Sequence, residues 1–132
     1  MDYLADSVTI IRHFPHSGVI GRSARLVLAD ADKGKHRIFI SVISLVEIMY
    51  LSQRNRIAIN LEETKRIINE SENYFIVDLT SGIVAVAERM KFPELFDRLI
   101  IATAESLHLP LLTPDHEITN SNLIKVIWDE PD

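Results

Sequence analysis

One stretch of the sequence decides the fold: Phe92-Pro-Glu-Leu-Phe-Asp-Arg-Leu-Ile-Ile-Ala-Thr-Ala-Glu-Ser-Leu-His-Leu-Pro-Leu-Leu-Thr-Pro-Asp-His-Glu117. Apolar residues at helical spacing predict a helix that Asp97 opens and that ends near His108. Pro110 prevents the helix from continuing, and the apolar pair that follows it is too short to be anything but a strand. The segment 113–115 ends that strand. The stretch therefore places Asp97 at the start of a helix and Asp115 just after a strand.

The length and composition limit what kind of protein this is. A chain of 132 residues is long enough for one domain with its own core, so we expect residues 1–132 to form a single domain. The absence of cysteine excludes disulfides, thiol nucleophiles and cysteine-ligated zinc. No apolar run approaches the roughly 20 residues of a membrane span, and the N-terminus lacks the basic start of a signal peptide. We therefore expect a cytoplasmic protein.

The net charge of −5 argues, taken alone, against a nucleic-acid binder, because such proteins usually carry a basic face. Acidic residues that hold divalent cations are partly neutralised in the working protein, however. The meaning of the charge therefore depends on where the acids lie in the fold.

The remaining elements follow from apolar spacing and from residues that favour turns. Strands are expected at residues 3–5, 37–41, 74–77, 111–112 and 123–128. Besides the helix near Asp97, helices are expected at 7–14, within 18–34, from the 41–47 segment to about 53, at 60–72 and from 80 to about 90, with a helical turn between the last two strands. Helices that separate successive strands require parallel pairing, and short apolar strands fit a sheet covered on both faces. The predicted fold is a three-layer α/β/α sandwich with a mostly parallel sheet of about five strands.

Two of the acidic residues have a purely structural explanation. Asp6 follows the first strand and precedes a helix, where aspartate is among the best N-caps. Ser44 and Glu47 match the capping-box pattern, in which the serine caps the helix and the glutamate reaches back to it. Each explanation would be complete for that residue taken by itself.

The predicted topology nevertheless brings four acids to one edge of the sheet. Parallel strands all end on the same side, and ligands of such sheets bind outside those carboxyl ends. Asp6 follows the first strand, the helix with Glu47 follows the second, and Asp115 follows the fourth. Asp97 begins the helix that leads into the fourth strand, so it starts near the same edge.

Asp97 is the most informative of these residues. It shares a helix face with Ile100, Ile101 and Ala104, so it points along the buried side of the helix. A buried carboxylate needs a partner, and several carboxylates in one crevice repel each other unless cations lie between them or some are protonated. Mg²⁺ or Mn²⁺ is the cation that oxygen ligands indicate, and a pair of such ions would serve phosphodiester hydrolysis.

Four motifs together resemble those of PIN-domain ribonucleases, and more narrowly the VapC-type toxins of type II toxin–antitoxin pairs. They are Tyr3-Leu-Ala-Asp6-Ser7, Ser41-x-x-Ser-Leu-x-Glu47, Phe96-Asp97-Arg-Leu-Ile-Ile-Ala-Thr-Ala104 and Leu112-Thr-Pro-Asp115. They occur in the right order over nearly the whole chain, and the motif around Asp97 is the most specific.

The resemblance implies a metal-dependent endoribonuclease that cleaves RNA, with tRNA or rRNA as frequent targets, by metal-activated water. The implied catalytic and metal-binding residues are Asp6, Glu47, Asp97 and Asp115, supported by Ser7, Ser44 and Thr113. The resemblance also implies a homodimer and inhibition by a small VapB-like antitoxin. Two features depart from the pattern: Pro114 separates Thr113 from Asp115, and the acidic composition leaves RNA contacts to a few residues, for which Arg12, Arg22, Arg25, Lys35 and Arg98 are the candidates.

Two other readings remain. The first is a PIN-like module that binds RNA or a protein partner without cutting, with its acids acting as caps and ion-pair members. The second is a phosphatase with Asp6 as nucleophile. That chemistry needs a second acid two residues on, where this chain has Val8, so the phosphatase reading is the weakest of the three.

Overall fold

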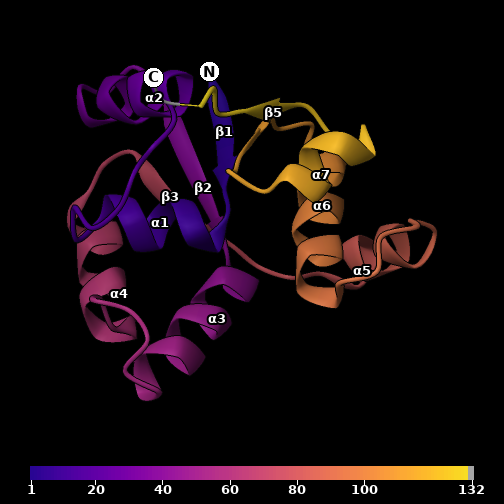
Figure 1. Cartoon of the computed structure of the whole chain (residues 1–132), viewed down its shortest axis with the longest axis horizontal. Coiled ribbons are helices and arrows are strands. Elements are labelled where there is room, and N and C mark those ends of the chain that lie inside the picture. Colours follow the sequence, from indigo (N-terminus) through magenta and orange to yellow (C-terminus); the bar gives the residue numbers. More distant parts are fainter. Residues whose placement is uncertain (131–132) are drawn as a thin grey trace.

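The protein is a three-layer α/β/α sandwich, seen in a computed structural model that describes residues 1–130 (Figure 1). Along the chain the elements are β1 (Asp2–Ala5), α1 (Ser7–His13), α2 (Arg22–Asp32), β2 (Arg37–Ser41), α3 (Val42–Gln53), α4 (Leu61–Glu70), β3 (Tyr74–Val77), α5 (Ser81–Glu88), α6 (Leu95–Leu107), β4 (Leu111–Leu112), α7 (His116–Ser121) and β5 (Val126–Ile127). This order of strands and helices confirms the predicted one. Within residues 1–130 no helix is both long and apolar enough to cross a membrane.

The sheet has five strands in the order β3-β2-β1-β4-β5, and every neighbouring pair is parallel. The predicted fold class is therefore confirmed. β1 lies in the centre, with Ala5 opposite Ile40 of β2 on one side and opposite Leu112 of β4 on the other. Because all strands run the same way, the segments that follow β1, β2 and β4 leave the sheet at one edge.

The two faces of the sheet are buried in two separate cores. On β1, Tyr3 and Ala5 point to one core and Leu4 to the other, as strand alternation requires. The first core also contains residues of α1, α2 and α4, and the second contains residues of α5, α6 and α7. Figure 1 shows these two groups of helices on opposite sides of β1 and β2.

Two helix starts differ from the prediction. α3 begins at Val42 because Ser41 is its N-cap and accepts a 3.0 Å hydrogen bond from the N–H of Ile43. The capping box proposed for Ser44 and Glu47 is therefore wrong. Ser41 still has extended backbone angles at the end of β2, so it meets the free N–H groups of the helix first. Ser44 is already inside the helix, fully buried, and its hydroxyl has no hydrogen-bond partner among the described residues.

The second difference concerns α6, which begins at Leu95 rather than at Asp97. Glu94 is its N-cap, and Asp97 lies within the first turn. The predicted C-terminal end is confirmed, because His108 adopts the left-handed conformation that commonly ends a helix. The last strand is shorter than predicted, covering only Val126–Ile127, and it lies at the edge of the sheet as expected.

Candidate active site

Asp6 is held at the junction of β1 and β4. Its backbone N–H donates to the carbonyl of Leu112 at 3.1 Å, which continues the parallel pairing one step past Ala5. Its side chain is buried; Oδ1 accepts hydrogen bonds from the N–H and hydroxyl of Thr9 at 2.9 and 2.8 Å, and Oδ2 accepts one from the hydroxyl of Thr113. Burial raises the pKa of Asp6, and the bonds from Thr113 and Thr9 oppose that rise. The predicted N-cap role of Asp6 is confirmed, but it occupies only one carboxylate oxygen.

Glu47 projects from the middle of α3 towards the start of α1. Its Oε1 accepts a 2.7 Å hydrogen bond from the hydroxyl of Ser7, which is itself buried. Burial raises the pKa of the half-buried Glu47, the charges of Glu94 and Asp6 raise it further, and the bond from Ser7 lowers it. The hydroxyl of Ser7 therefore orients one oxygen of Glu47. Ser44, another predicted supporting residue, makes no such bond within the described part of the chain.

Asp97 is the carboxylate on which the others act most strongly. Burial raises its pKa to about 7, with further contributions from the charges of Glu94, Asp115, Glu47 and Asp6, in that order. The structure therefore brings the other three predicted acids, Asp6, Glu47 and Asp115, within electrostatic reach of Asp97. A half-buried carboxylate whose pKa is raised by burial and by several neighbouring acids marks this cluster as the candidate functional site.

Glu94 is an acid that the sequence prediction missed. Its Oε2 accepts a 2.6 Å hydrogen bond from the N–H of Asp97, and its charge contributes the largest electrostatic part of the rise in the pKa of Asp97. The signal was present in the sequence, because a polar residue three positions before Asp97 suits an N-cap. Glutamate is not among the preferred caps, however, so the sequence pattern favours Asp97 as the start of the helix.

Asp115 is the N-cap of α7, and its Oδ1 accepts a 3.0 Å hydrogen bond from the N–H of Ile118. Its own N–H donates to the hydroxyl of Thr113 at 3.1 Å, and the same hydroxyl donates to Asp6. Thr113 thus links the two acids. Pro114, which lies between Thr113 and Asp115, does not turn Asp115 away from the other acids, because the charge of Asp115 raises the pKa of both Asp6 and Asp97.

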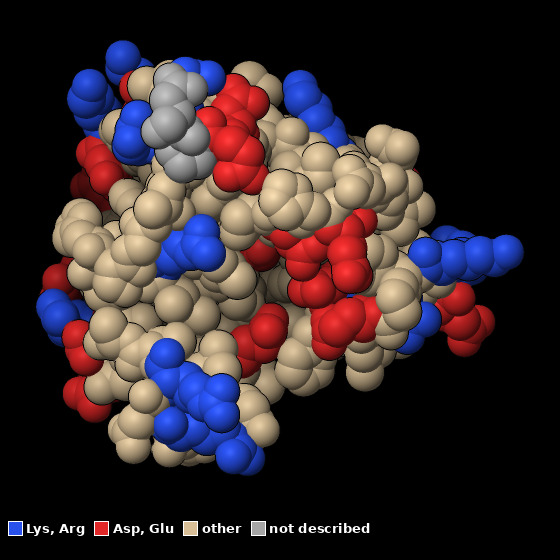
Figure 2. Space-filling model, in the orientation of Figure 1, with Lys and Arg blue, Asp and Glu red and all other residues tan. Residues whose placement is uncertain are grey.

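The donor set suits a hard divalent cation. The acids offer only carboxylate oxygens, flanked by hydroxyls, which are the ligands that Mg²⁺ and Mn²⁺ prefer. Figure 2 shows acidic atoms around a hollow at the centre of the face that it presents. Within residues 1–130, no three His, Cys, Asp or Glu side chains are gathered closely enough to form a ready cation site. The acids are thus coupled electrostatically without forming a closed ligand cage.

The predicted RNA contacts fall into two groups, one beside the acidic residues and one on or just after α2. Arg12 lines a surface cavity of about 410 Å³ together with Asp115, and it donates a 3.0 Å hydrogen bond to the carbonyl of Val19. Arg98 follows Asp97 on α6 and is half-buried. The other three are exposed and lie on α2 or in the loop that follows it: Arg22, Arg25 and Lys35.

The family model for the PIN domain matches residues 3–121, which is nearly the whole chain. The chain belongs to the PIN-domain family, a family of nucleases that generally use divalent metal ions. No curated protein sequence matched the chain at a significant level.

Solved structures with a similar fold include several toxin–antitoxin complexes. A chain of the Rickettsia felis VapBC2 complex bound to a promoter DNA fragment superposes with a TM-score of 0.72 at 16% identity, over 98% of this chain and 100% of that one. A chain of the DNA-bound VapBC complex of Salmonella typhimurium superposes with a TM-score of 0.66 at 16% identity, over 96% of this chain and 96% of that one. A chain of a Klebsiella pneumoniae toxin–antitoxin complex superposes with a TM-score of 0.56 at 22% identity, over 86% of this chain and 86% of that one. At these identities the likeness concerns the fold.

Proposed function

We propose that this protein is a metal-dependent endoribonuclease in which Asp6, Glu47, Asp97 and Asp115 bind Mg²⁺ or Mn²⁺ and carry the catalysis. One observation carries the proposal, namely that four carboxylates lie around the half-buried Asp97, where burial and their charges raise its pKa to about 7. Such a cluster is costly without cations to neutralise it. The PIN-domain family supplies the reaction class.

The residues of the site have separable tasks. Divalent ions held there supply Lewis-acid chemistry for hydrolysis of a phosphodiester. Thr9 and Thr113 orient the two oxygens of Asp6, and Ser7 orients one oxygen of Glu47. Burial and the neighbouring charges raise the pKa of Asp97 to about 7, so this carboxyl would give up a proton near neutral pH in order to hold a cation.

We further propose that the protein is the toxin of a toxin–antitoxin pair in the cytoplasm. The support is the likeness of its fold to chains of VapBC and other toxin–antitoxin complexes. The proposed partners are RNA, with tRNA or rRNA as the first candidates, a small VapB-like antitoxin and a second copy of this chain. Co-expression with the product of a neighbouring small gene, followed by purification through a tag on one partner and a mass measurement, tests both the antitoxin and the dimer.

The second candidate is a PIN-like module that binds RNA or protein without cutting. It is favoured by the capping roles of Asp6 and Asp115, which give both residues a structural task. It does not account for Asp97, because the neighbouring acids repel its negative charge and the N-cap of its helix is Glu94.

The deciding experiment is incubation of purified protein with a mixed tRNA and rRNA pool in Mg²⁺, in Mn²⁺ or in chelator. The wild type is compared with Asp97→Asn and with Glu105→Gln, which removes an exposed carboxylate from the same helix. The proposal expects discrete fragments from the wild type and Glu105→Gln in the presence of metal, and none from Asp97→Asn. Intact RNA with folded wild-type protein in every metal would favour the binding module.

A further inference from the structure

The face of α3 that carries Glu47 continues beyond the acid cluster with an exposed aromatic residue and an arginine. Glu47, Tyr50 and Arg54 are spaced i, i+3 and i+7, so they follow one side of the helix. Tyr50 is 52% exposed, although tyrosine usually buries its ring. The guanidinium carbon of Arg54 lies 4.3 Å from the centre of the Tyr50 ring, within the range of a cation–π contact.

The end of α3 holds a second arginine beside the first. Arg54 is the C-cap, and Asn55 follows in the left-handed conformation with φ of 55°. The N–H of Arg56 then donates to the carbonyl of Leu51 at 3.0 Å, and that of Asn55 to the carbonyl of Ser52 at 3.0 Å. These two bonds form a Schellman motif, which fixes the backbone of both arginines.

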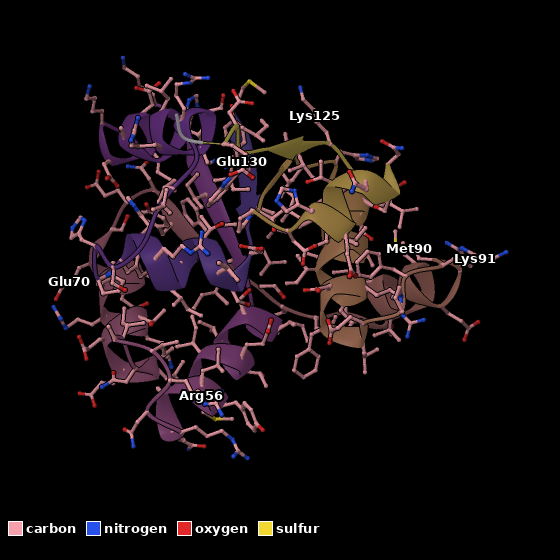
Figure 3. The ribbon with its side chains drawn as sticks, in the orientation of Figure 1. Arg56, Glu70, Met90, Lys91, Lys125 and Glu130 are labelled. Atoms are coloured by element: carbon pink, nitrogen blue, oxygen red, sulfur yellow. The ribbon has the colours of Figure 1, made fainter. Side chains whose placement is uncertain are left out.

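Among the described residues, no acid forms an ion pair with either of these two arginines. Both are exposed. Arg37, by contrast, pairs with Asp2, and Arg66 pairs with Glu70. Figure 3 places Arg56 beyond the end of α3, and Figure 2 shows basic atoms gathered at that position, on the same face as the acidic hollow.

An RNA nuclease with this charge distribution needs such a patch. The chain has a net charge of −5, and its candidate site is lined by carboxylates, so the site alone repels a phosphate backbone. Arg54 lies seven positions after Glu47, which corresponds to a rise of about 10 Å along the helix. This distance corresponds to roughly three nucleotides of a stacked nucleic-acid strand, at about 3.4 Å per nucleotide.

We infer that α3 guides single-stranded RNA at the site, with a base stacked on Tyr50 and phosphates bound by Arg54 and Arg56. The inference rests on the proposed nuclease function and identifies residues that bind its substrate. A flat aromatic ring beside a stacked guanidinium suits an unpaired base, and the unpaired charges suit the flanking phosphates. Duplex RNA keeps its base faces stacked inside the helix, so the chemistry of Tyr50 selects a single strand.

The test measures RNA binding separately from cleavage. A fluorescein-labelled single-stranded RNA oligonucleotide is titrated with full-length protein in chelator, and its anisotropy gives Kd for the wild type, Tyr50→Ala, Tyr50→Phe, Arg54→Ala and Arg89→Ala. Arg89 is the matched control because it is also an exposed arginine at a helix C-cap. It directly precedes Met90 and Lys91, which Figure 3 shows at the right of the view, away from Arg56. Melting temperatures of all variants identify any change that is only structural.

We expect Tyr50→Ala and Arg54→Ala to weaken binding by about fivefold or more, and Tyr50→Phe and Arg89→Ala to bind like the wild type. Arg54→Ala should also lower the dependence of log Kd on log salt concentration by about 0.7. In Mn²⁺ the same two variants should raise KM for cleavage and leave kcat unchanged.

Equal Kd values for Tyr50→Ala, Arg54→Ala and Arg89→Ala would overturn the inference. So would a change in dimer mass or antitoxin binding at Tyr50 with the RNA affinity unaltered, because the face would then belong to a protein partner. Binding by the wild type that depends on Tyr50 and Arg54, without cleavage in any metal, would support the RNA path and contradict the nuclease proposal, so the two failures are distinguishable.

Discussion

The carboxylate of Glu94 accepts a hydrogen bond of 2.6 Å from the backbone N–H of Asp97, so the cap of α6 and a candidate metal ligand share one helical turn. The bond satisfies a free donor at the start of the helix. The same negative charge opposes ionisation of Asp97 and contributes to the rise of its pKa to about 7. Glu94 therefore stabilises the helix and at the same time increases the need of the site for a cation.

Replacing Glu94 separates these two effects. Glu94→Gln keeps a side-chain acceptor but removes the charge, so we expect the pKa of Asp97 to fall and the acid limb of the pH–rate profile in Mn²⁺ to move to lower pH. Glu94→Ala also loses the cap and should lower the free energy of unfolding by about 1 kcal/mol. The pH–rate profile reports the change in the pKa of Asp97, and urea unfolding reports the loss of stability. If Glu94→Gln abolished both cleavage and the stabilisation by metal, Glu94 would be a metal ligand.

The raised pKa of Asp97 predicts how stability depends on pH without metal. The pKa is about 7 in the folded protein against the ordinary aspartate value of 3.8, so the folded state binds the proton more tightly than the unfolded chain. This contribution to stability is fully present below pH 3.8 and is lost as the pH rises to about 7. We expect the Tm in chelator to fall over that window, and to fall less in Asp97→Asn.

Added Mn²⁺ should reverse the trend, because the ion competes with the proton for the same oxygens. The gain in Tm on adding Mn²⁺ should therefore increase with pH in the wild type and in Glu105→Gln, and should be small at every pH in Asp97→Asn. A gain that is independent of pH, or that is equal in Asp97→Asn, would contradict binding of the ion at this residue.

Thr113 should prove important through its hydroxyl alone. Thr113→Val keeps the shape but leaves the buried Oδ2 of Asp6 without its donor, and it also removes the acceptor for the N–H of Asp115. We expect a loss of about 1–3 kcal/mol in the free energy of unfolding and a large drop in cleavage, whereas Thr113→Ser should restore most of both. Unfolding in urea and initial rates in Mn²⁺ give the comparison. Full activity in Thr113→Val would show that Asp6 is positioned without it.

Two serines in neighbouring turns of α3 should respond in opposite ways. Ser41→Ala removes the N-cap of the helix and should cost about 1 kcal/mol. Ser44→Ala removes a buried hydroxyl that has no hydrogen-bond partner among the described residues, so it should leave stability unchanged or raise it. Urea unfolding of the two variants side by side measures the difference. A loss of activity in Ser44→Ala with stability retained would instead give its hydroxyl a role towards substrate or metal.

Local sequence predicted the elements well where a single strong cue dominates. The β-branched and aromatic run of β2, the strand β3 and the left-handed end of α6 at His108 all lie where they were expected. The cues were weaker where two capping residues competed. Ser41 and Ser44 both suit an N-cap, and only the end of the preceding strand decides between them. Glu94 and Asp97 present the same competition at the start of α6.

The sequence by itself determined the class of fold and the four acids that the topology sends to one edge. It did so because helices between strands impose parallel pairing, and parallel strands end together. The tertiary structure decided which hydroxyls hold those acids, that Glu94 joins them, and that the pKa of Asp97 rises to about 7. These outcomes depend on burial and on distances between elements far apart in the chain, as between Asp6 and Thr113, which local patterns do not contain.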